Sequence, residues 1–415
     1  MQASFFGWRV VAGAFVLAVF GWGLGFYGPP VYLHAVQEAH GWSVALVSGA
    51  VTVHFLAGAI VVANLPRLYR RYGLPAVTKT GAALLALGML GWAMADEPWQ
   101  LLLATLPSGA GWAAMGAAAV NAIIAPWFVT KRAAALASAY NGASIGGAIF
   151  SPLWVVAIAW LGFPAAALAI GGVMAVAIWL LSDLIFSRTP ESLGQSPDGI
   201  GLASDVAAVG RTAGMNPWRD LRFLTLAAAM SLGLFAQIGL IAHLFSLISP
   251  ALGEQTAGIV MGVATAAAIV GRTMVGWLMP EGTDRRLVAC ANHVVQIIGS
   301  VTLFMAAGDN AVLLIAGVLL FGVGIGNTTS LPPLIAQAEF HRGDALRVVS
   351  LIVAISQGTY AFAPAVFGAL RGLSASEGAA VFIAAAVLQG LAILAFFAGR
   401  RAVRPVRAAH QPPRA

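Results

Sequence analysis

Charged residues are scarce in this sequence. Asp, Glu, Lys and Arg make up 9% of the 415 residues, whereas a typical soluble chain carries about 25%. Apolar residues make up 60% of the chain, and the mean hydropathy is +0.88. This composition excludes an ordinary soluble domain and predicts a polytopic membrane protein, with the lipid bilayer as its first partner.

Cysteine is almost absent as well. Cys290 is the single one, so the chain can form neither an internal disulfide nor a metal site built from cysteines. The sequence also lacks a recognisable nucleophile–base pair, a metal-ligand cluster and a phosphate-binding loop. We therefore expect no catalytic residue, no metal and no cofactor, which leaves a membrane-embedded enzyme or sensor as the least supported class of function.

Acidic side chains are missing from the centres of the long apolar segments. Twelve such segments are present, and each is long enough to cross a bilayer as a helix, which takes about 20 residues. The sequence therefore predicts an all-α membrane protein with twelve transmembrane helices. The expected spans lie near residues 8–33, 43–65, 75–95, 99–127, 133–160, 163–187, 221–249, 255–280, 286–307, 311–338, 346–370 and 377–399.

Positive charge is distributed unevenly along the chain. If the N-terminus is cytoplasmic, all but two of the 22 Lys and Arg side chains fall in even-numbered loops, their flanks or the termini. The exceptions are Arg371, in an outer loop, and Arg272, within a span. This asymmetry predicts a multi-pass protein of the inner membrane with both termini cytoplasmic. It also accounts for most of the net charge of +7, so nucleic acid is not an expected partner.

One long polar connection divides the twelve segments into two groups of six. Residues 188–218 contain three prolines and several glycines, which disfavour a continuous helix. We therefore expect a six-helix bundle over 1–187, a cytoplasmic linker over 188–218, and a second six-helix bundle over 219–415 that ends in a basic tail.

The two halves share glycines and prolines at matching positions. Gly146 and Pro152 in the fifth segment correspond to Gly358 and Pro364 in the eleventh. A weak internal repeat of this kind is typical of transporter folds, and it predicts that the two bundles are pseudo-symmetric.

Arg272 is the single charge in the run from 256 to 280. A guanidinium inside a bilayer costs about 2.5–3.5 kcal/mol on insertion scales, which predicts a position facing protein or a wet cavity. Gly271 beside it and Gly276 about one turn on would let a neighbouring helix approach closely. Aligning the halves places Arg272 opposite Gly58, so the charge occurs in one half alone, which suits a functional role. The alternative, that Arg272 snorkels to the cytoplasmic surface, stays open.

The tenth segment carries polar residues shortly before two prolines. Asn327 and Thr328 begin the polar run, which ends at Ser330, and Pro332 and Pro333 follow. Prolines free upstream backbone carbonyls, and broken helices near the midplane often line transporter binding sites. We therefore expect a local break there, with Asn327 and Thr328 facing a substrate cavity.

Polar side chains are few in the remaining spans. Each can contact a substrate or form an interhelical hydrogen bond, and both interpretations stay open. With no central carboxylate, histidines are the side chains best placed to titrate near neutral pH. The candidates for substrate binding are Arg272, Asn327, Thr328, Gln357, Tyr360, Asn141, Tyr27 and Gln237, and those for proton coupling are His54 and His243.

Three stretches carry a familiar pattern. They are residues 7–11 (GWRVV) with 41–43 (GWS), residues 127–147 with the Lys131-Arg132 pair, and residues 271–278 around Arg272. With these stretches the chain resembles the major facilitator superfamily, and within it the monocarboxylate-transporter-like branch that includes bacterial oxalate–formate exchangers. The resemblance implies the major facilitator fold and transport by alternating access. It also gives Arg272 the place of the family's carboxylate-binding arginine.

Several positions depart from the pattern of these relatives. Arg70 stands where the superfamily's loop motif has an aspartate, and Ala268 stands where animal members of the branch have an aspartate one turn before the arginine. Pro29-Pro30 replaces a lysine near the end of the first helix, and Gln357 is nearest to the exchangers' lysine in the eleventh. The resemblance therefore implies neither a particular substrate nor proton coupling.

The leading interpretation is a secondary active transporter that moves a small organic anion across the inner membrane as a functional monomer, with protons as a candidate second partner. A monocarboxylate is favoured, because one arginine can hold one carboxylate with two hydrogen bonds and no second cation is visible in the spans. The alternative within the same fold is an exporter of amphipathic or neutral compounds in which Arg272 is structural.

Overall fold

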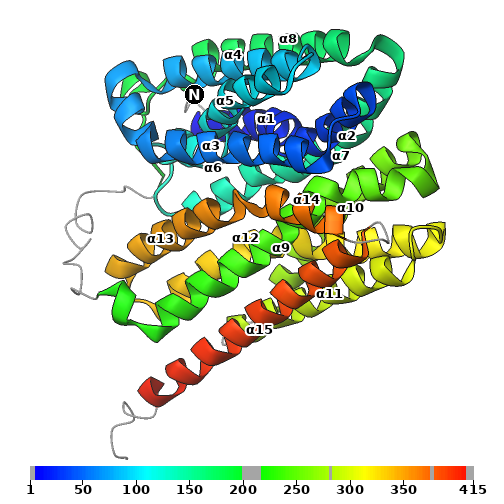
Figure 1. Cartoon of the computed structure of the whole chain (residues 1–415). Helices are drawn as coiled ribbons and strands as arrows, with labels where there is room; N and C mark the ends of the chain where they lie inside the picture. Colours follow the sequence, from blue (N-terminus) through cyan, green and yellow to red (C-terminus); the bar gives the residue numbers. More distant parts are fainter. Residues whose placement is uncertain (1–4, 199–215, 280–282, 374–377, 408–415) are drawn as a thin grey trace, which may run out of the picture. The chain divides into compact units, whose positions relative to one another are not determined.

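The structure is a computed structural model, and it describes residues 5–198, 216–279, 283–373 and 378–407 (Figure 1). Within these ranges the regular structure is helical, apart from one isolated bridge between Phe128 and Asp198. Twelve helical stretches of the described residues are long and apolar enough to cross a membrane. The predicted number of spans is therefore confirmed, and the chain is an all-α multi-pass membrane protein.

The helices follow one another along the chain with short connections, except for the linker. The first six spans consist of α1 (Gly7–Gly25) with α2 (Gly28–His40), α3 (Val44–Tyr72), α4 (Leu74–Ala93), α5 (Pro98–Met115) with α6 (Ala117–Ile124), α7 (Arg132–Leu161), and α8 (Phe163–Leu181) with a π-helical turn at Ser182–Phe186. The other six consist of α9 (Leu221–Leu252), α10 (Glu254–Leu278), α11 (Arg285–Met305), α12 (Ala311–Glu339), α13 (Arg342–Tyr360) with α14 (Ala363–Leu373), and α15 (Ala379–Arg407).

Prolines explain two of the three interruptions within the spans. A proline has no N–H to donate, and its ring clashes with the carbonyl four residues earlier. α1 ends at Gly25, four positions before Pro29, and α13 ends at Tyr360, four positions before Pro364. The third interruption separates α5 from α6. Because α2 continues beyond the break, the first span reaches His40 rather than the predicted end near residue 33.

The tenth span does not break, so that prediction is wrong. α12 runs without interruption from Ala311 to Glu339 through Pro332 and Pro333. Leu331 and Ile335 flank the prolines and are buried in a hydrophobic cluster. Packing of the neighbouring residues therefore holds the helix together where two N–H donors are lost.

The described residues fall into two compact units. Unit 1 comprises Met1–Ala203 with Ala242–Ala266, and unit 2 comprises Ser204–Ile241 with Ala267–Ala415. The C-terminal part of α9 and the N-terminal part of α10 thus belong to unit 1, and the rest of both helices belongs to unit 2. The predicted bundle boundaries, 1–187 and 219–415, stay a prediction.

Aromatic contacts fix the interrupted first span inside unit 1. The Tyr32 ring on α2 packs edge-on against Trp154 of α7, with 4.8 Å between ring centroids. The Tyr32 hydroxyl donates to the carbonyl of Leu24 on α1 at 3.1 Å. These contacts hold α2 against both α1 and α7.

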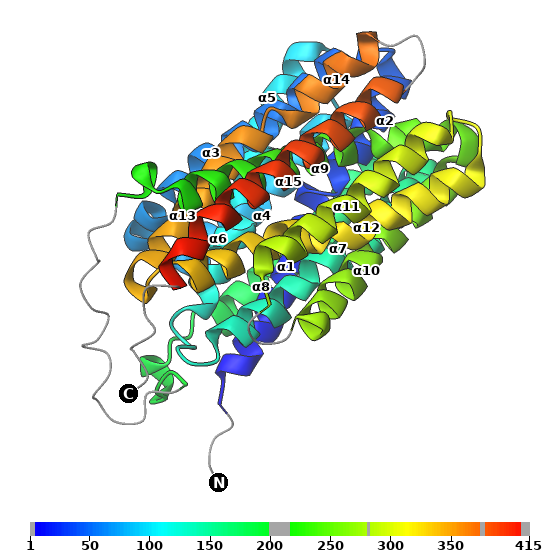
Figure 2. The ribbon, with the colours of Figure 1, turned by 90° about the horizontal axis from the view of Figure 1, so that it is seen from below.

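An ion pair is buried among the helices of unit 2, where α11 packs along α12 and α15 (Figure 2). Arg286, at the start of α11, is 1% exposed and donates to both carboxylate oxygens of Glu339 on α12, at 2.7 and 2.9 Å. Its guanidinium also donates to the Arg222 carbonyl of α9 at 3.0 Å and to Thr225 Oγ1 at 3.2 Å. This arginine therefore joins the ends of three helices.

Candidate functional site

Arg272 lies where α10 passes close to α12. A Cβ atom built on Gly271 would come 2.1 Å from the carbonyl oxygen of Val323, so the two backbones are in contact there. On the facing helix, a Cβ atom on Gly326 would come 2.8 Å from Arg272 Nη2 and 2.9 Å from the carbonyl oxygen of Ala268. The guanidinium therefore lies across a glycine of α12, in a space that a larger residue at 326 would fill.

The Arg272 side chain is partly exposed, although it belongs to a closely packed pair of helices. A Cβ atom on Gly276 would meet nothing within 4 Å, so the close approach is made by Gly271 and not by Gly276. Arg272 is thus accessible in part, while the backbone that carries it is held against α12.

Asn327 and Thr328 follow the glycine that Arg272 covers, and both are 2% exposed. The Thr328 hydroxyl donates to the Gly324 carbonyl at 3.1 Å. The Oδ1 atom of Asn327 has no hydrogen-bond partner among the described residues. A buried acceptor without a partner costs about 1–3 kcal/mol, so a ligand that completes this bond would be stabilising.

Four helices of unit 2 share a buried polar network around Gln296 of α11. Its Nε2 donates to Gln237 Oε1 on α9 at 3.1 Å, and its Oε1 accepts from Gln389 Nε2 on α15 at 3.4 Å. Thr328 Oγ1 of α12 lies 3.4 Å from the same Oε1. Two candidates from the sequence, Gln237 and Thr328, are thus brought together by a residue that the sequence analysis did not select.

The sequence contains a signal for this network. Asn292, Gln296 and Ser300 follow one another at intervals of four in an apolar segment, and such positions share one face of a helix. All three are buried in the structure, and Asn292 Nδ2 donates to the Gly324 carbonyl at 3.2 Å. A search for polar residues at helical spacing would have found this stripe.

Gln357 and Tyr360 lie one turn apart at the end of α13 in unit 2. Both are partly exposed, and Tyr360 packs against the hydrophobic cluster that includes Ile352. They stand directly before the interruption of the eleventh span, where the backbone departs from a continuous helix.

Tyr27 and Asn141 lie in unit 1, whereas Arg272 lies in unit 2. Tyr27 occupies the interruption between α1 and α2 and is 5% exposed. A Cβ atom on Gly147 of α7 would come 2.7 Å from the Tyr27 ring and 2.8 Å from Thr265 Cγ2, so these residues are in close contact. Asn141, also on α7, is partly exposed.

His54 has a hydrogen-bond partner at each ring nitrogen. It is 1% exposed, with Nε2 2.9 Å from the Gly25 carbonyl oxygen and Nδ1 2.8 Å from Ser108 Oγ. A carbonyl can only accept, so Nε2 carries a proton, and the neutral ring can accept the Ser108 hydroxyl proton at Nδ1. This geometry favours the interhelical hydrogen-bond interpretation, which links α1, α3 and α5.

Two further histidines are buried in the spans. His243, on α9, is fully buried. His293, on α11, lies with Nδ1 2.8 Å from the Ala289 carbonyl oxygen, and its Nε2 has no hydrogen-bond partner among the described residues. The Nε2 atom faces α9, where a Cβ atom on Gly233 would come 2.4 Å from it. The sequence analysis did not select His293, although a histidine inside an apolar segment was the available signal.

The family model described as Major Facilitator Superfamily matches residues 10–364, most of the chain. The chain belongs to the major facilitator superfamily. The fold class expected from the sequence is therefore confirmed, and the protein is a membrane transporter with a small-molecule substrate. The narrower resemblance to the monocarboxylate-transporter-like branch stays a prediction.

Similar proteins agree with the family. MFS-type transporter 1 of Ophiocordyceps sp. (strain BCC 1869) is 27% identical over 358 residues, which cover 84% of this chain and 75% of that protein. The nucleoside transporter NupG has a TM-score of 0.69 at 13% identity, over 97% of this chain and 100% of that one. A bacterial homologue of the human lysosomal transporter Spinster, in an inward-facing and occupied conformation, has a TM-score of 0.71 at 14% identity. The match covers 99% of this chain and 100% of that one. At these identities the solved structures show the fold alone.

The Lys131-Arg132 stretch of this major facilitator transporter is fixed by the start of the linker. The Asp198 carboxylate accepts from the backbone N–H groups of Val129 at 2.7 Å and Lys131 at 2.9 Å, and from the Thr130 hydroxyl at 3.2 Å. These bonds hold the loop that precedes α7. The linker beyond residue 198 and up to 215 lies outside the described residues.

Proposed function

We propose that this major facilitator transporter moves a small organic anion by alternating access, and that Arg272 binds the carboxylate of that anion. The observation that carries the proposal is that Arg272, a partly exposed residue inside an apolar span, lays its guanidinium across Gly326. A charge in the bilayer costs about 2.5–3.5 kcal/mol on insertion scales. An anionic substrate would offset part of that cost each time it binds.

A monocarboxylate is the favoured substrate class. The planar guanidinium can donate two parallel hydrogen bonds to one carboxylate, and a lysine cannot reproduce this fork. A dicarboxylate would favour a second cation, and the sequence places the other Lys and Arg residues at the ends of the spans or outside them. The resemblance around residues 127–147 and 271–278 supports the same substrate class.

A second candidate function is supported by the same contact. Because the guanidinium also lies near the Ala268 carbonyl and the backbone of α12, Arg272 could serve to join the two helices. The protein would then be an exporter of amphipathic or neutral compounds with a structural arginine. Transport of a neutral amphipathic dye by wild type, together with a lower melting temperature of the Arg272→Gln variant, would favour this candidate.

The energetics of an anion require a coupling mechanism. A monoanion that enters against an inside-negative potential of about 100 mV is opposed by about 2.3 kcal/mol. This corresponds to a roughly forty- to fifty-fold concentration ratio. Uptake therefore needs a proton, an exchanged anion or a steep inward gradient.

Three buried histidines are the coupling candidates that we propose for proton symport. Both ring nitrogens of His54 have partners, and protonation of Nδ1 would require the Ser108 hydroxyl to turn from donor to acceptor. His293 has an open Nε2 among the described residues, so it can take up a proton without losing a hydrogen bond. His243 is equally buried. We therefore place His293 before His54 and His243.

Uptake of labelled lactate, pyruvate, formate and oxalate into proteoliposomes tests the proposed function. A pH gradient and a membrane potential are imposed separately, so that symport, exchange and simple charge movement can be told apart. Arg188→Gln is the control variant, because it removes one exposed arginine outside the spans. We expect saturable uptake of a monocarboxylate by wild type and by the control. Failure of every organic anion to be transported would contradict the proposal.

We further propose that the protein lies in the inner membrane with both termini cytoplasmic, because Lys and Arg gather in the even-numbered loops and at the termini. We also propose that it acts as a monomer. A reporter fused after Ala415 should be active in the cytoplasm. Activity only outside the cell would contradict this orientation. Light scattering of the purified protein should give the mass of one chain.

A further inference from the structure

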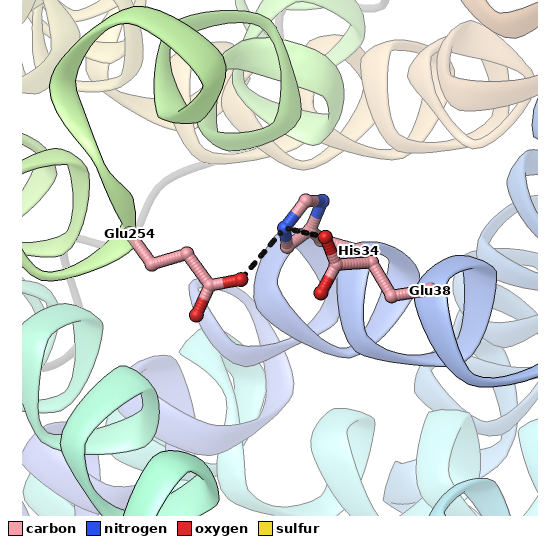
Figure 3. A group of neighbouring side chains, drawn as sticks. All are labelled: His34, Glu38 and Glu254. Carbon is pink, nitrogen blue, oxygen red and sulfur yellow. Dashed lines mark hydrogen bonds and ion pairs between the residues drawn. The ribbon is translucent and has the colours of Figure 1, made fainter.

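Three potential metal ligands meet in unit 1 at the end of the first span. His34 and Glu38 lie on α2, and Glu254 is the first residue of α10 (Figure 3). Their ligand atoms all lie within 4.8 Å of one another. All three residues belong to unit 1, which includes the N-terminal part of α10. The positive-inside rule places this end of both helices on the outer side of the membrane.

The two distances from His34 to the carboxylates are close to those between neighbouring ligands of a tetrahedral ion. His34 Nε2 lies 3.4 Å from Glu38 Oε1 and 3.2 Å from Glu254 Oε1. Zinc bonds of about 2.0–2.2 Å to nitrogen and oxygen place neighbouring ligand atoms of a tetrahedron about 3.3–3.6 Å apart. His34 and Glu38 are also separated by one helical turn, the spacing at which two side chains of a helix can hold one ion.

A proton on His34 Nε2 binds the two carboxylates less well than a divalent metal ion would. Both carboxylates approach the same nitrogen of His34, and they come from different sides of the ring (Figure 3). One N–H group can make only one well-aligned hydrogen bond, so one of the two carboxylates is left with a poor bond. A divalent cation would accept all three ligand atoms at once and neutralise both carboxylates.

The histidine is the fixed member of the cluster, and the carboxylates are the adaptable members. The side chain of His34 is 16% exposed, and its ring packs edge-on against Phe245 with 5.1 Å between ring centroids. The side chains of Glu38 and Glu254 are 62% and 47% exposed, so they can close on an ion that arrives from solvent. The exposed side leaves room for a water molecule as fourth ligand, as in other zinc sites with three protein ligands.

We propose that His34, Glu38 and Glu254 bind a divalent transition-metal ion of the Zn²⁺ class at the outer face. Imidazole together with carboxylates favours Zn²⁺ over Mg²⁺ and Ca²⁺, which prefer oxygen ligands alone. The bound ion joins the start of α10 to α2. Since Arg272 lies on the same α10, the ion also slows any transport step in which α10 moves relative to α2. This last consequence rests on the proposed function, whereas ion binding does not.

Equilibrium dialysis of the purified full-length protein against Zn²⁺ tests the binding directly and needs no transport. We expect one ion per chain at pH 7.5, and at least about tenfold weaker binding in His34→Gln and in Glu254→Gln. His40→Gln is the control for the histidine, because His40 lies on the same helix and stacks on Trp42. Asp96→Asn is the control for the carboxylates, because Asp96 is an exposed acid in an outer loop of unit 1. Both controls should bind as wild type does.

A variant that should bind Zn²⁺ more tightly tests the site even if His34→Gln or Glu254→Gln does not fold. Glu38→His places two imidazoles one turn apart, and it should bind Zn²⁺ several-fold more tightly. Mg²⁺ at the same concentration should not compete.

Three results would overturn the metal site. The first is wild-type Zn²⁺ binding in His34→Gln, and the second is a Glu38→His variant that binds no more tightly than wild type. The third is a melting temperature that does not respond to Zn²⁺, because an ion that joins α2 to α10 should stabilise the folded protein. If Zn²⁺ binds but no organic anion is transported, the site stands and the proposed function fails.

Discussion

Two close contacts between helices, one in each unit, are built alike and differ in one charge at the contact. In unit 1, a Cβ atom on Gly109 of α5 would come 2.0 Å from the carbonyl oxygen of His54 on α3. In unit 2, a Cβ atom on Gly271 of α10 would come 2.1 Å from the carbonyl oxygen of Val323 on α12. Both pairs therefore pack through a glycine that lies directly against the backbone of the neighbouring helix.

The aligned positions show that this packing does not need an arginine. Gly58 corresponds to Arg272 in the repeat, and a Cβ atom on Gly58 would lie 3.1 Å from the Gly109 carbonyl oxygen. The α3–α5 pair is thus complete with a glycine where the α10–α12 pair carries a guanidinium. The charge in unit 2 is an addition to a packing scheme that works without it, and this favours a role in substrate binding.

The largest loss of stability should come from replacing Arg286, a structural arginine, and the Arg272 variant is compared with it. Arg286→Gln leaves the Glu339 carboxylate, whose side chain is 12% exposed, without its main cation, which costs up to about 3–5 kcal/mol of unfolding free energy. The measurement is unfolding of the purified protein in mixed micelles. If Arg272→Gln destabilises the protein as much as Arg286→Gln does, the two arginines have the same structural role. The assignment of Arg272 to substrate binding would then be wrong.

The next effect tests whether the two helix pairs are equivalent. Gly109→Ala and Gly271→Ala should each destabilise the protein by about 1–3 kcal/mol, because each Cβ would collide with a backbone carbonyl that cannot turn aside. Gly276→Ala is the control, since a Cβ there meets nothing within 4 Å. If one of the two glycine variants melted at the wild-type temperature, the two helix pairs would not pack in the same way.

Histidine variants separate a structural group from a coupling group. His54→Gln should lower the unfolding free energy by about 0.5–1.5 kcal/mol, because it disturbs bonds to Gly25 and Ser108, and it should keep pH-driven uptake. His293→Gln should instead remove the response of uptake to a pH gradient. The two assignments are reversed if uptake driven by the pH gradient is lost in His54→Gln and kept in His293→Gln.

The smallest effect concerns acid stability at the start of α11. Burial tends to raise the pKa of Asp284, but hydrogen bonds from Arg400 and from the backbone N–H groups of Leu287 and Arg286 outweigh it, so the pKa is lowered. A carboxyl group whose pKa is lowered by folding stabilises the protein at neutral pH, and this contribution is lost as the pH falls through the folded-state value. Asp284→Asn should therefore flatten the acid side of the melting-temperature profile below about pH 4.

The expected loss at pH 7 is below about 1 kcal/mol, because the Asp284–Arg400 pair is partly exposed to solvent. Melting temperatures of wild type and variant between pH 3 and pH 7 provide the measurement. Identical profiles would show that the pair contributes nothing to stability.

Much of the fold followed from hydropathy and proline positions. The twelve spans were predictable because a helix must satisfy its own backbone in lipid, and this requires long apolar runs. The breaks before Pro29 and Pro364 follow from the geometry of proline. The continuity of α12 through Pro332 was not predictable, because it depends on how Leu331 and Ile335 pack in the folded protein.

The site was predictable where one residue type is unusual in its own segment. Arg272 is a charge in an apolar run, and Gly271 beside it indicated the close helix contact. Contacts between distant segments left no comparable signal. The sequence does not indicate that Gln296 joins Gln237 to Gln389, or that Glu254 meets His34, because these pairs depend on how the helices pack in three dimensions.

The most direct test of the central claim is anion binding by Arg272 variants of the purified protein. Titration calorimetry with the best-transported monocarboxylate compares wild type, Arg272→Lys, Arg272→Gln and the control Arg188→Gln. We expect unchanged melting temperatures without ligand and wild-type binding by the control. Arg272→Lys should bind roughly 10- to 150-fold more weakly, because loss of hydrogen bonds to a charged group costs about 1.5–3 kcal/mol. Wild-type affinity in Arg272→Gln would contradict the account.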